Sequence, residues 1–266
     1  AGCRVREVEH PQTARPIADV VAAPVRRRAR APHAGLRCVL VVLGSGVICL
    51  LGAQQRAALT ASVPRAAAAA PDLDLAALGR THLLSRFVDG LNTSAPHPEY
   101  PRPQLQRSRW LSLNGWWEWQ ELRVNVSLGS TLTNRILVPF AVEAPLSGIR
   151  EGRAAWQKMR YRRSFVLPAT WPQCGSGEGG GVLLHFGAVD WKADVHVNGR
   201  WAGSHRGGYT PFSLDVSAHL LPGGTAQWLE VDVLDESDAH GQPVGKQRRS
   251  PGNIWYTSVS GIWGSV

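Results

Sequence analysis

Cysteine is scarce in this sequence and follows no recognisable spacing. The four cysteines are Cys3, Cys38, Cys49 and Cys174. They form no C-x-x-C pair and no Cys/His cluster with the spacing of a zinc site. The sequence therefore predicts no disulfide framework, no metal site and no cofactor.

Several familiar catalytic and architectural signatures are also absent. No serine stands in the G-x-S-x-G pattern that exposes a nucleophile on a strand-to-helix turn. No repeat with a period of about 20–50 residues is visible. No alternation of strand and helix patterns of the kind that builds a (β/α)8 barrel is present. These absences argue against a serine-triad hydrolase, a repeat protein and a barrel enzyme made from these residues alone.

Excess positive charge is nearly absent from the larger part of the chain. Residues 1–60 contain nine arginines and three acidic residues, a balance of +6. The net charge is +9, so the remaining 206 residues carry +9 minus +6, or +3. Basicity confined to the N-terminal end, with a nearly balanced globular part, argues against nucleic acid as a partner.

Residues 1–53 have the composition of a leader. Residues 1–37 are rich in Ala, Arg, Pro and Val without periodicity, which predicts a disordered basic segment. Residues 38–53 carry no charge, and one apolar helix of that length spans about 24 Å. Because arginines precede this run, we predict a single-pass transmembrane signal anchor, with the following domain lumenal or extracellular. A cleaved secretory signal or an organellar transit peptide is the alternative.

Residues 54–94 separate the apolar run from the folded part. They include five consecutive alanines followed by Pro71, a low-complexity composition typical of a linker or stalk. Helical spacing from Leu73 to Val88 is only partial. We therefore predict that the main folded domain begins close to residue 95.

The stretch of residues 181–212 has the clearest strand pattern in the chain. Residues 193–197 alternate apolar and polar side chains, which is the period of two of a half-buried strand. Asn198-Gly199 follows at once and suits both positive-φ positions of a type I′ turn. This stretch therefore predicts a β-hairpin.

Further strands are predicted on both sides of the hairpin. Trp117 and Trp119 alternate with polar residues, so their indoles share one sheet face. Residues 136–140 form a short apolar run, and residues 228–234 alternate cleanly. Several short strands separated by turn signals, without a convincing helix after Pro98, predict an all-β sandwich.

The predicted sandwich contains a long series of ordered motifs. They are P-R-P-Q-x-x-R (101–107), L-N-G-x-W (113–117), V-P-F-x-x-E-x-x-L-S-G (138–148), F-G-A-V-D-W-x-A-x-V-x-V-N-G (186–199), G-x-H-x-G-G-Y-T-P-F (203–212), Q-P-x-G-K-Q (242–247) and I-W-Y-x-x-V-S-G-I-W (254–263). This series resembles the N-terminal sugar-binding domain of glycoside hydrolase family 2, which includes β-galactosidases, β-glucuronidases and β-mannosidases.

The resemblance implies a jelly-roll β-sandwich, similar to a galactose-binding domain, over residues 95–266. Its implied partner is a β-linked sugar or glycan. In the family a catalytic (β/α)8 barrel follows this domain and carries two glutamates, since retaining glycosidases need two carboxyls about 5–5.5 Å apart. We therefore expect a fragment without catalytic residues of its own, joined in a full-length protein to a downstream barrel that hydrolyses O-glycosyl bonds.

The resemblance also implies that the polar loop after residue 234 helps to hold the non-reducing sugar. The predicted contacts are Asp238, Lys246, Asn253 and Trp255. Carboxylate and amide groups would bond to sugar hydroxyls, and the indole would stack on the sugar ring.

Two further candidate residues come from the hairpin region, and one rival interpretation concerns the polar loop itself. His205 and Tyr209 lie in the G-x-H-x-G-G-Y-T-P-F motif, where packing beside glycines and contact with a ligand explain them equally well. Asp235 and Asp238 suggest a catalytic pair, but an Asp-Glu-Ser-Asp cluster is more typical of a solvated turn.

Three functions are compatible with these patterns. The preferred one is the sugar-binding domain of a family 2 glycosidase. The alternatives are a free-standing, lectin-like carbohydrate-binding module and a structural surface protein that binds no sugar.

Overall fold

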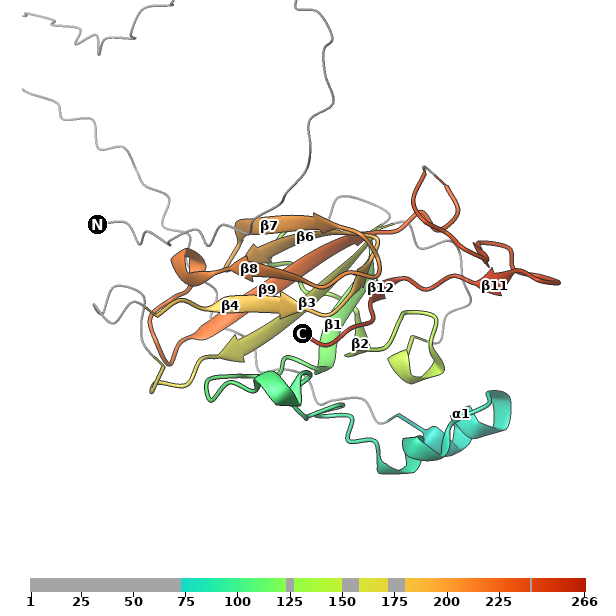
Figure 1. The fold of residues 1–266 in the computed structure, drawn as a ribbon, viewed down its shortest axis with the longest axis horizontal. Helices are drawn as coiled ribbons and strands as arrows, with labels where there is room; N and C mark the ends of the chain where they lie inside the picture. Colours follow the sequence, from blue (N-terminus) through green and yellow to red (C-terminus); the bar gives the residue numbers. More distant parts are fainter. Residues whose placement is uncertain (1–72, 123–126, 150–157, 172–179, 240) are drawn as a thin grey trace, which may run out of the picture. The chain divides into compact units, whose positions relative to one another are not determined.

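A computed structural model describes residues 73–122, 127–149, 158–171, 180–239 and 241–266. These residues are mostly strands, with few and short helices (Figure 1). The helical elements are α1 (Leu75–Thr81), η1 (Arg86–Gly90), η2 (Pro103–Leu105), η3 (Pro145–Ser147) and η4 (Ser217–His219). The strands are β1 (Gly115–Glu121), β2 (Asn134–Val138), β3 (Lys158–Val166), β4 (Leu183–Phe186), β5 (Val189–Asp190), β6 (Lys192–Val197), β7 (Arg200–Arg206), β8 (Phe212–Asp215), β9 (Ala226–Leu234), β10 (Gln247–Arg248), β11 (Tyr256–Thr257) and β12 (Gly261–Ile262).

Six of these strands form one sheet in the order β2-β1-β3-β9-β6-β7. Every neighbouring pair in this sheet is antiparallel. The central pair, β3 and β9, runs in register from Lys158 opposite Leu234 to Val166 opposite Ala226. The sheet therefore depends on the pairing of segments that are far apart in the sequence.

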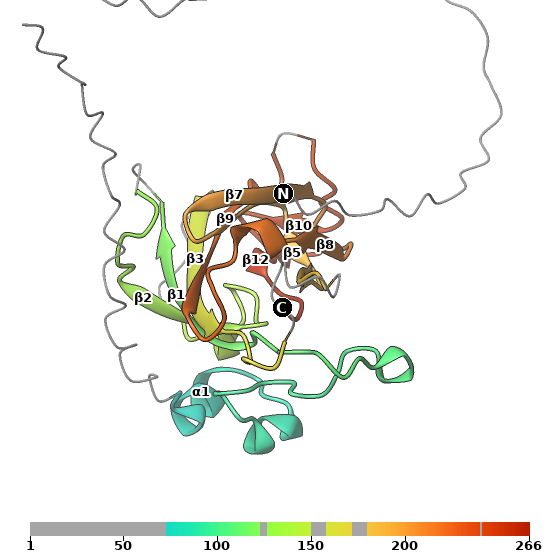
Figure 2. The ribbon, with the colours of Figure 1, turned by 90° about the vertical axis from the view of Figure 1, so that its left-hand side faces the viewer.

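Short strand pairs form a second layer against one face of this sheet. The pairs are β4 with β8 and β5 with β12, and Figure 2 shows them on one side of the large sheet. Leu184, Phe186, Val189 and Ile262 from these pairs belong to the same buried cluster as side chains of the six-stranded sheet. Because the hydrophobic core lies between two β layers, the prediction of an all-β sandwich is confirmed.

The core side chains come from the alternating positions that the sequence indicated. Trp117 and Trp119 are 0% and 1% exposed, and Ala193, Val195 and Val197 are all fully buried. The Trp117 indole N–H also donates a hydrogen bond to the Leu113 carbonyl over 2.8 Å. The Trp117 indole is therefore buried in the core with its N–H donor still hydrogen-bonded.

The predicted hairpin turn is present between β6 and β7. Asn198 and Gly199 have φ values of 52° and 75°, as a type I′ turn requires. The Asn198 side chain donates to the Gln227 side chain over 2.8 Å and accepts from the Trp228 backbone N–H over 2.8 Å. This asparagine therefore fixes the hairpin end to β9 as well as forming the turn.

The prediction of a single-pass membrane protein is wrong on the structure. The seven residues of α1 span about 10 Å, whereas a bilayer core is about 30 Å thick. No helix in the described residues is long and apolar enough to cross a membrane. The segments at 1–37 and 38–53, which gave rise to the prediction, lie outside the described residues. We withdraw the membrane-anchored placement.

Two glycines with similar backbone angles allow a test of core packing. Gly261 has a φ of 87° and a Cβ there would overlap the Tyr161 hydroxyl, whereas Gly199, with a φ of 75°, has open space around it. Gly199→Ala should lower the free energy of unfolding by about 1–2 kcal/mol, the cost of a left-handed conformation. Gly261→Ala should cost about 1–3 kcal/mol more, because the core is overpacked as well. Urea denaturation measures both variants, and equal losses would contradict the role assigned to the Tyr161 contact.

Candidate functional site

The candidate site lies on the segment between β9 and β12, residues 235–260. Two short parallel strands, β10 and β11, pair within it, with Gln247 opposite Tyr256. A bridge between Gly252 and Trp255 closes the turn that joins them. The segment therefore folds back on itself and presents residues 246–256 together.

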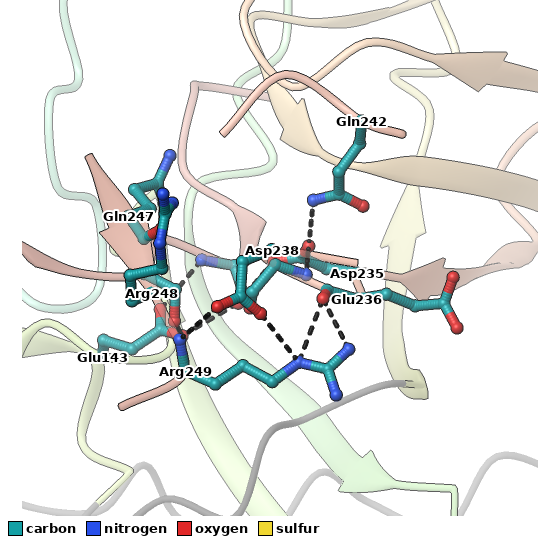
Figure 3. Close-up of polar contacts among 11 residues, drawn as sticks. Glu143, Asp235, Glu236, Asp238, Gln242, Gln247, Arg248 and Arg249 are labelled. Carbon is teal, nitrogen blue, oxygen red and sulfur yellow. Dashed lines mark hydrogen bonds and ion pairs between the residues drawn. The ribbon is translucent and has the colours of Figure 1, made fainter. Parts of the chain in front are cut away.

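The segment is fixed to the sandwich at its first residue, Asp235. This side chain is 1% exposed, and one carboxylate oxygen accepts bonds of 2.7 Å from the Ser237 N–H and from the Gln242 amide (Figure 3). Its other oxygen lies 2.7 Å from the Ser260 hydroxyl. The interpretation of this region as a solvated turn therefore does not apply to Asp235.

Asp238, a predicted sugar contact, forms an ion pair within the same segment. The Arg249 Nε atom lies 3.3 Å from one Asp238 carboxylate oxygen (Figure 3). The Arg249 guanidinium also donates to the Glu236 carbonyl over 3.1 and 2.6 Å. Because the pair is partly exposed, it contributes no more than about 1 kcal/mol.

Two cations and two aromatic rings lie on the exposed side of the segment. The Arg248 guanidinium carbon is 4.0 Å from the centroid of the Trp255 ring, and the Lys246 amino group is 5.7 Å from that of Tyr256. Trp255 is 39% exposed and Tyr256 is 61% exposed. Cation–π attraction orders these side chains, and Arg248 covers part of the Trp255 indole.

Asn253 lies in the turn between β10 and β11, two residues before Trp255. It is exposed and has a φ of 51°, a left-handed conformation that asparagine tolerates better than most residues. The two short strands around this turn are held together by a 2.8 Å bond between the Tyr256 N–H and the Lys246 carbonyl.

Tyr209 and His205, the two candidates from the hairpin region, have different surroundings. The Gln247 amide donates to the Tyr209 hydroxyl over 2.6 Å, which joins Tyr209 to the candidate segment. The His205 ring instead stacks on Phe212 with centroids 4.3 Å apart. Phe212 packs against the core, so the structure assigns His205 a packing contact.

An acidic side chain without a predicted role, Asp190, lies buried against Gly208, the residue before Tyr209. It is 3% exposed, and Gly208 packs so closely on its carboxyl group that no Cβ fits there. Burial, followed by the charges of Asp235 and Glu143, raises the pKa of Asp190 from 3.8 to about 7. Burial and the Asp190 charge also raise the pKa of Tyr209.

Residues 92–266 match the family described as "Glycosyl hydrolases family 2, sugar binding domain". The chain belongs to this family. The recognition made from the ordered motifs is thereby confirmed.

Individual relatives of this family 2 domain match shorter stretches. A β-galactosidase of Thermoanaerobacter pseudethanolicus is 39% identical over 73 residues, which are 27% of this chain and 9% of that protein. A β-glucuronidase of Paenibacillus borealis is 29% identical over 89 residues, 32% of this chain and 14% of that protein. The chain thus matches only about a tenth of the length of these curated relatives. Among solved structures, a β-glucuronidase of Faecalibacterium prausnitzii aligns with a TM-score of 0.41 and 28% identity, covering 54% of this chain and 24% of that one.

The family 2 domain brings most of the predicted site residues into one segment. Lys246, Asn253 and Trp255 lie on the turns around β10 and β11, Asp238 faces Arg249, and Tyr209 reaches the segment through Gln247. His205 instead contacts Phe212 and Thr210. Among the described residues, no group of three or more His, Cys, Asp or Glu side chains is arranged to hold a metal ion.

Sequence reasoning missed the residues that contact or closely surround these candidates. They are Glu143, Asp190, Gln247, Arg248, Arg249 and Ser260. The sequence did offer one signal for some of these residues, namely a place inside a recognised motif. This holds for Glu143, Asp190, Gln247 and Ser260. Their roles require knowledge of partners that are distant in the sequence.

Asp190 should make the domain less stable as the pH rises from about 4 to about 7. Its pKa is raised in the folded state, so the unfolded chain loses this proton first and is favoured by the rise. The loss is on the order of a few kcal/mol across that window. In Asp190→Asn this dependence should disappear, and the Tm near neutral pH should exceed that of the wild type. Calorimetry of the two proteins across the pH range measures the effect.

Asp194→Asn is a suitable control for this experiment. Asp194 is a carboxylate on β6 that pairs with Lys192 over 2.8 Å and is 35% exposed. Its variant should keep the pH profile of the wild type. Parallel profiles for wild type and Asp190→Asn would contradict the assignment.

Proposed function

We propose that this chain acts as the sugar-binding domain of a family 2 glycosidase and contacts the non-reducing end of a β-linked sugar or glycan. The family match over residues 92–266 supports the class of ligand. The relatives named as a β-galactosidase and a β-glucuronidase make β-galactosides and β-glucuronides the first ligands to test. The observation that carries the proposal is the exposed surface of residues 246–256.

This surface has the chemistry that sugars require. A pyranose ring presents C–H groups on its faces and hydroxyls at its rim, so it binds to an aromatic face flanked by polar groups. Trp255 and Tyr256 supply the aromatic rings, and Lys246, Arg248 and Asn253 supply hydrogen-bond donors beside them. Asp238 and Tyr209 lie at the margins of the same segment and extend the polar rim.

The proposal includes the jelly-roll topology implied by the family. The six-stranded antiparallel sheet and the shorter opposing pairs support it. It also assigns glycoside hydrolysis to a catalytic barrel that works with this domain, and no catalytic role to this chain. Two carboxyls of the chain, the half-buried Glu143 and the buried Asp235, are engaged by Ser260 and by backbone and amide donors, as expected for structural groups.

Two other functions give different experimental results. A free-standing lectin-like module would bind sugars with full affinity as the isolated sandwich. A structural surface protein would fold in the same way and bind no sugar at a saturable site.

Replacement of Trp255 by alanine should weaken sugar binding. Loss of the stacked indole should raise the Kd for methyl β-D-galactoside or methyl β-D-glucuronide by about tenfold, because such contacts contribute about 1–1.5 kcal/mol. Ligand-observed NMR titration measures the change. Trp201→Ala is the matched control, since Trp201 is 60% exposed on β7, outside the segment of residues 235–260. Equal loss in both variants would contradict the placement of the site, and no saturable binding by the folded wild type would favour the structural role.

A further inference from the structure

Two cations, Arg248 and Lys246, stand beside exposed aromatic rings on the proposed sugar-binding surface. Residues 246–256 contain three cations and no Asp or Glu. The third cation, Arg249, is offset by Asp238, whose carboxylate lies 3.3 Å from its Nε atom. Within the part of the chain that the structure describes, neither Arg248 nor Lys246 forms an ion pair with a carboxylate. This part of the surface therefore carries a surplus of positive charge.

Arg248 is held in one orientation by two contacts. Its Nη1 atom donates to the Gln247 carbonyl over 2.6 Å, and its guanidinium carbon lies 4.0 Å from the centroid of the Trp255 ring. Gln247 is fixed in turn, since its side chain donates to the Tyr209 hydroxyl and accepts from the Val259 N–H, each over 2.6 Å. A ligand that binds this guanidinium therefore needs to order few further side chains, which lowers the entropic cost of binding.

The Arg248 guanidinium retains donors that a ligand can use. Its bond to Gln247 uses Nη1, while Nε and Nη2 make no hydrogen bond with any described residue. A guanidinium stacked on an aromatic ring directs its N–H groups outward in its own plane, where they match the paired oxygens of an anionic group. A carboxylate or a sulfate presents such a pair, whereas a neutral hydroxymethyl group presents a single oxygen. Lys246 adds a compact point charge on a flexible stem.

The acidic groups at the base of the segment are engaged elsewhere. Asp235 is 1% exposed and accepts bonds from backbone, amide and Ser260 hydroxyl donors. Glu143 accepts bonds from the N–H and the hydroxyl of Ser260. Neither carboxyl is joined to Arg248 in the described structure. An anionic group on a bound sugar is thus the partner whose charge complements the exposed cations.

We propose that Arg248, assisted by Lys246, is a specificity-determining residue that makes this surface prefer sugars with an anionic group, a carboxylate or a sulfate, over neutral sugars of the same stereochemistry. The preference rests on the proposed function, because it requires a sugar beside Trp255. It also adds to that function, since aromatic stacking by itself does not distinguish a neutral sugar from an acidic one.

Ligand-observed NMR titration of the intact chain tests the preference with three sugars that differ only at position 6. They are methyl β-D-glucoside, methyl β-D-glucuronide and the 6-sulfate of methyl β-D-glucoside. At least one anionic sugar should bind about fivefold more tightly than the neutral one, which is the strength of a partly exposed ion pair. The two anionic probes distinguish a carboxylate from a sulfate as the preferred group. Raising the salt concentration from 0.01 M to 1 M shortens the Debye length from about 30 Å to about 3 Å and should remove most of the preference.

Three arginine variants locate the origin of the preference. Arg248→Met keeps an apolar side chain next to Trp255 but removes the charge and the donors, so the ratio of neutral to anionic Kd should fall to about one. Arg248→Lys keeps the charge without the two-donor fork, so the ratio should be intermediate. Arg200→Met is the matched control, because Arg200 is an exposed arginine on β7 that also donates to a backbone carbonyl, that of Ala218, over 2.7 Å. This control should keep the ratio of the wild type.

The outcomes separate the preference from the proposed function. Equal Kd values for the neutral and anionic sugars in the wild type would overturn the preference and leave the proposed function standing. A preference that survives in Arg248→Met, or that is lost equally in Arg200→Met, would also overturn it. If the folded wild type bound none of the three sugars at a saturable site, the proposed function would be wrong and the preference with it.

Discussion

The packing of one apolar face of the six-stranded sheet against short strand pairs is the interaction on which the rest of the structure depends. The sheet cannot cover that face by itself, because its strands alternate buried and outward-facing side chains. Two of the covering strands, β5 and β12, pair with each other, and β12 follows the candidate segment directly. The segment of residues 235–260 thus starts from the large sheet and ends in the opposite layer. Its two ends are fixed by the hydrophobic core rather than by its own short strands.

Polar groups are buried where the two layers meet at that segment. Asp190, Asp235 and Ser260 are each less than 4% exposed, which is costly unless the groups are bonded or neutral. Backbone and side-chain donors satisfy Asp235, and the raised pKa of Asp190 reduces the charge that must be buried near neutral pH. A buried polar network of this kind selects one conformation rather than adding strongly to the free energy of unfolding. It fixes one conformation of a segment that has little regular structure of its own.

The outer side of the segment has the opposite character. There, cations and aromatic rings are exposed and order one another across short distances. The proposed function gives this surface a chemical role, because aromatic rings beside hydrogen-bond donors suit a sugar. A buried, hydrogen-bonded polar base beneath an exposed aromatic rim explains how a segment with little regular structure keeps one conformation at its surface.

The sequence alone determined the features that depend on local order. Alternation placed Trp117, Trp119 and the β6 side chains in the core, and Asn198-Gly199 specified a turn, because periodicity and turn conformation are properties of neighbouring residues. The ordered motifs determined the family. The apolar run at 38–53 led to a membrane placement that the described residues do not support, because none of their helices is long and apolar enough to cross a membrane.

Only the tertiary structure decided which distant side chains meet. Glu143 and Ser260 are 117 residues apart in sequence, and Asp235 and Ser260 are 25 apart, so no spacing rule relates them. Arg249 engages Asp238, and Arg248 covers part of Trp255, because the segment of residues 235–260 folds back on itself and pairs its short parallel strands β10 and β11. These contacts and the pKa of Asp190 arise from burial between two layers, and burial is a consequence of the fold as a whole.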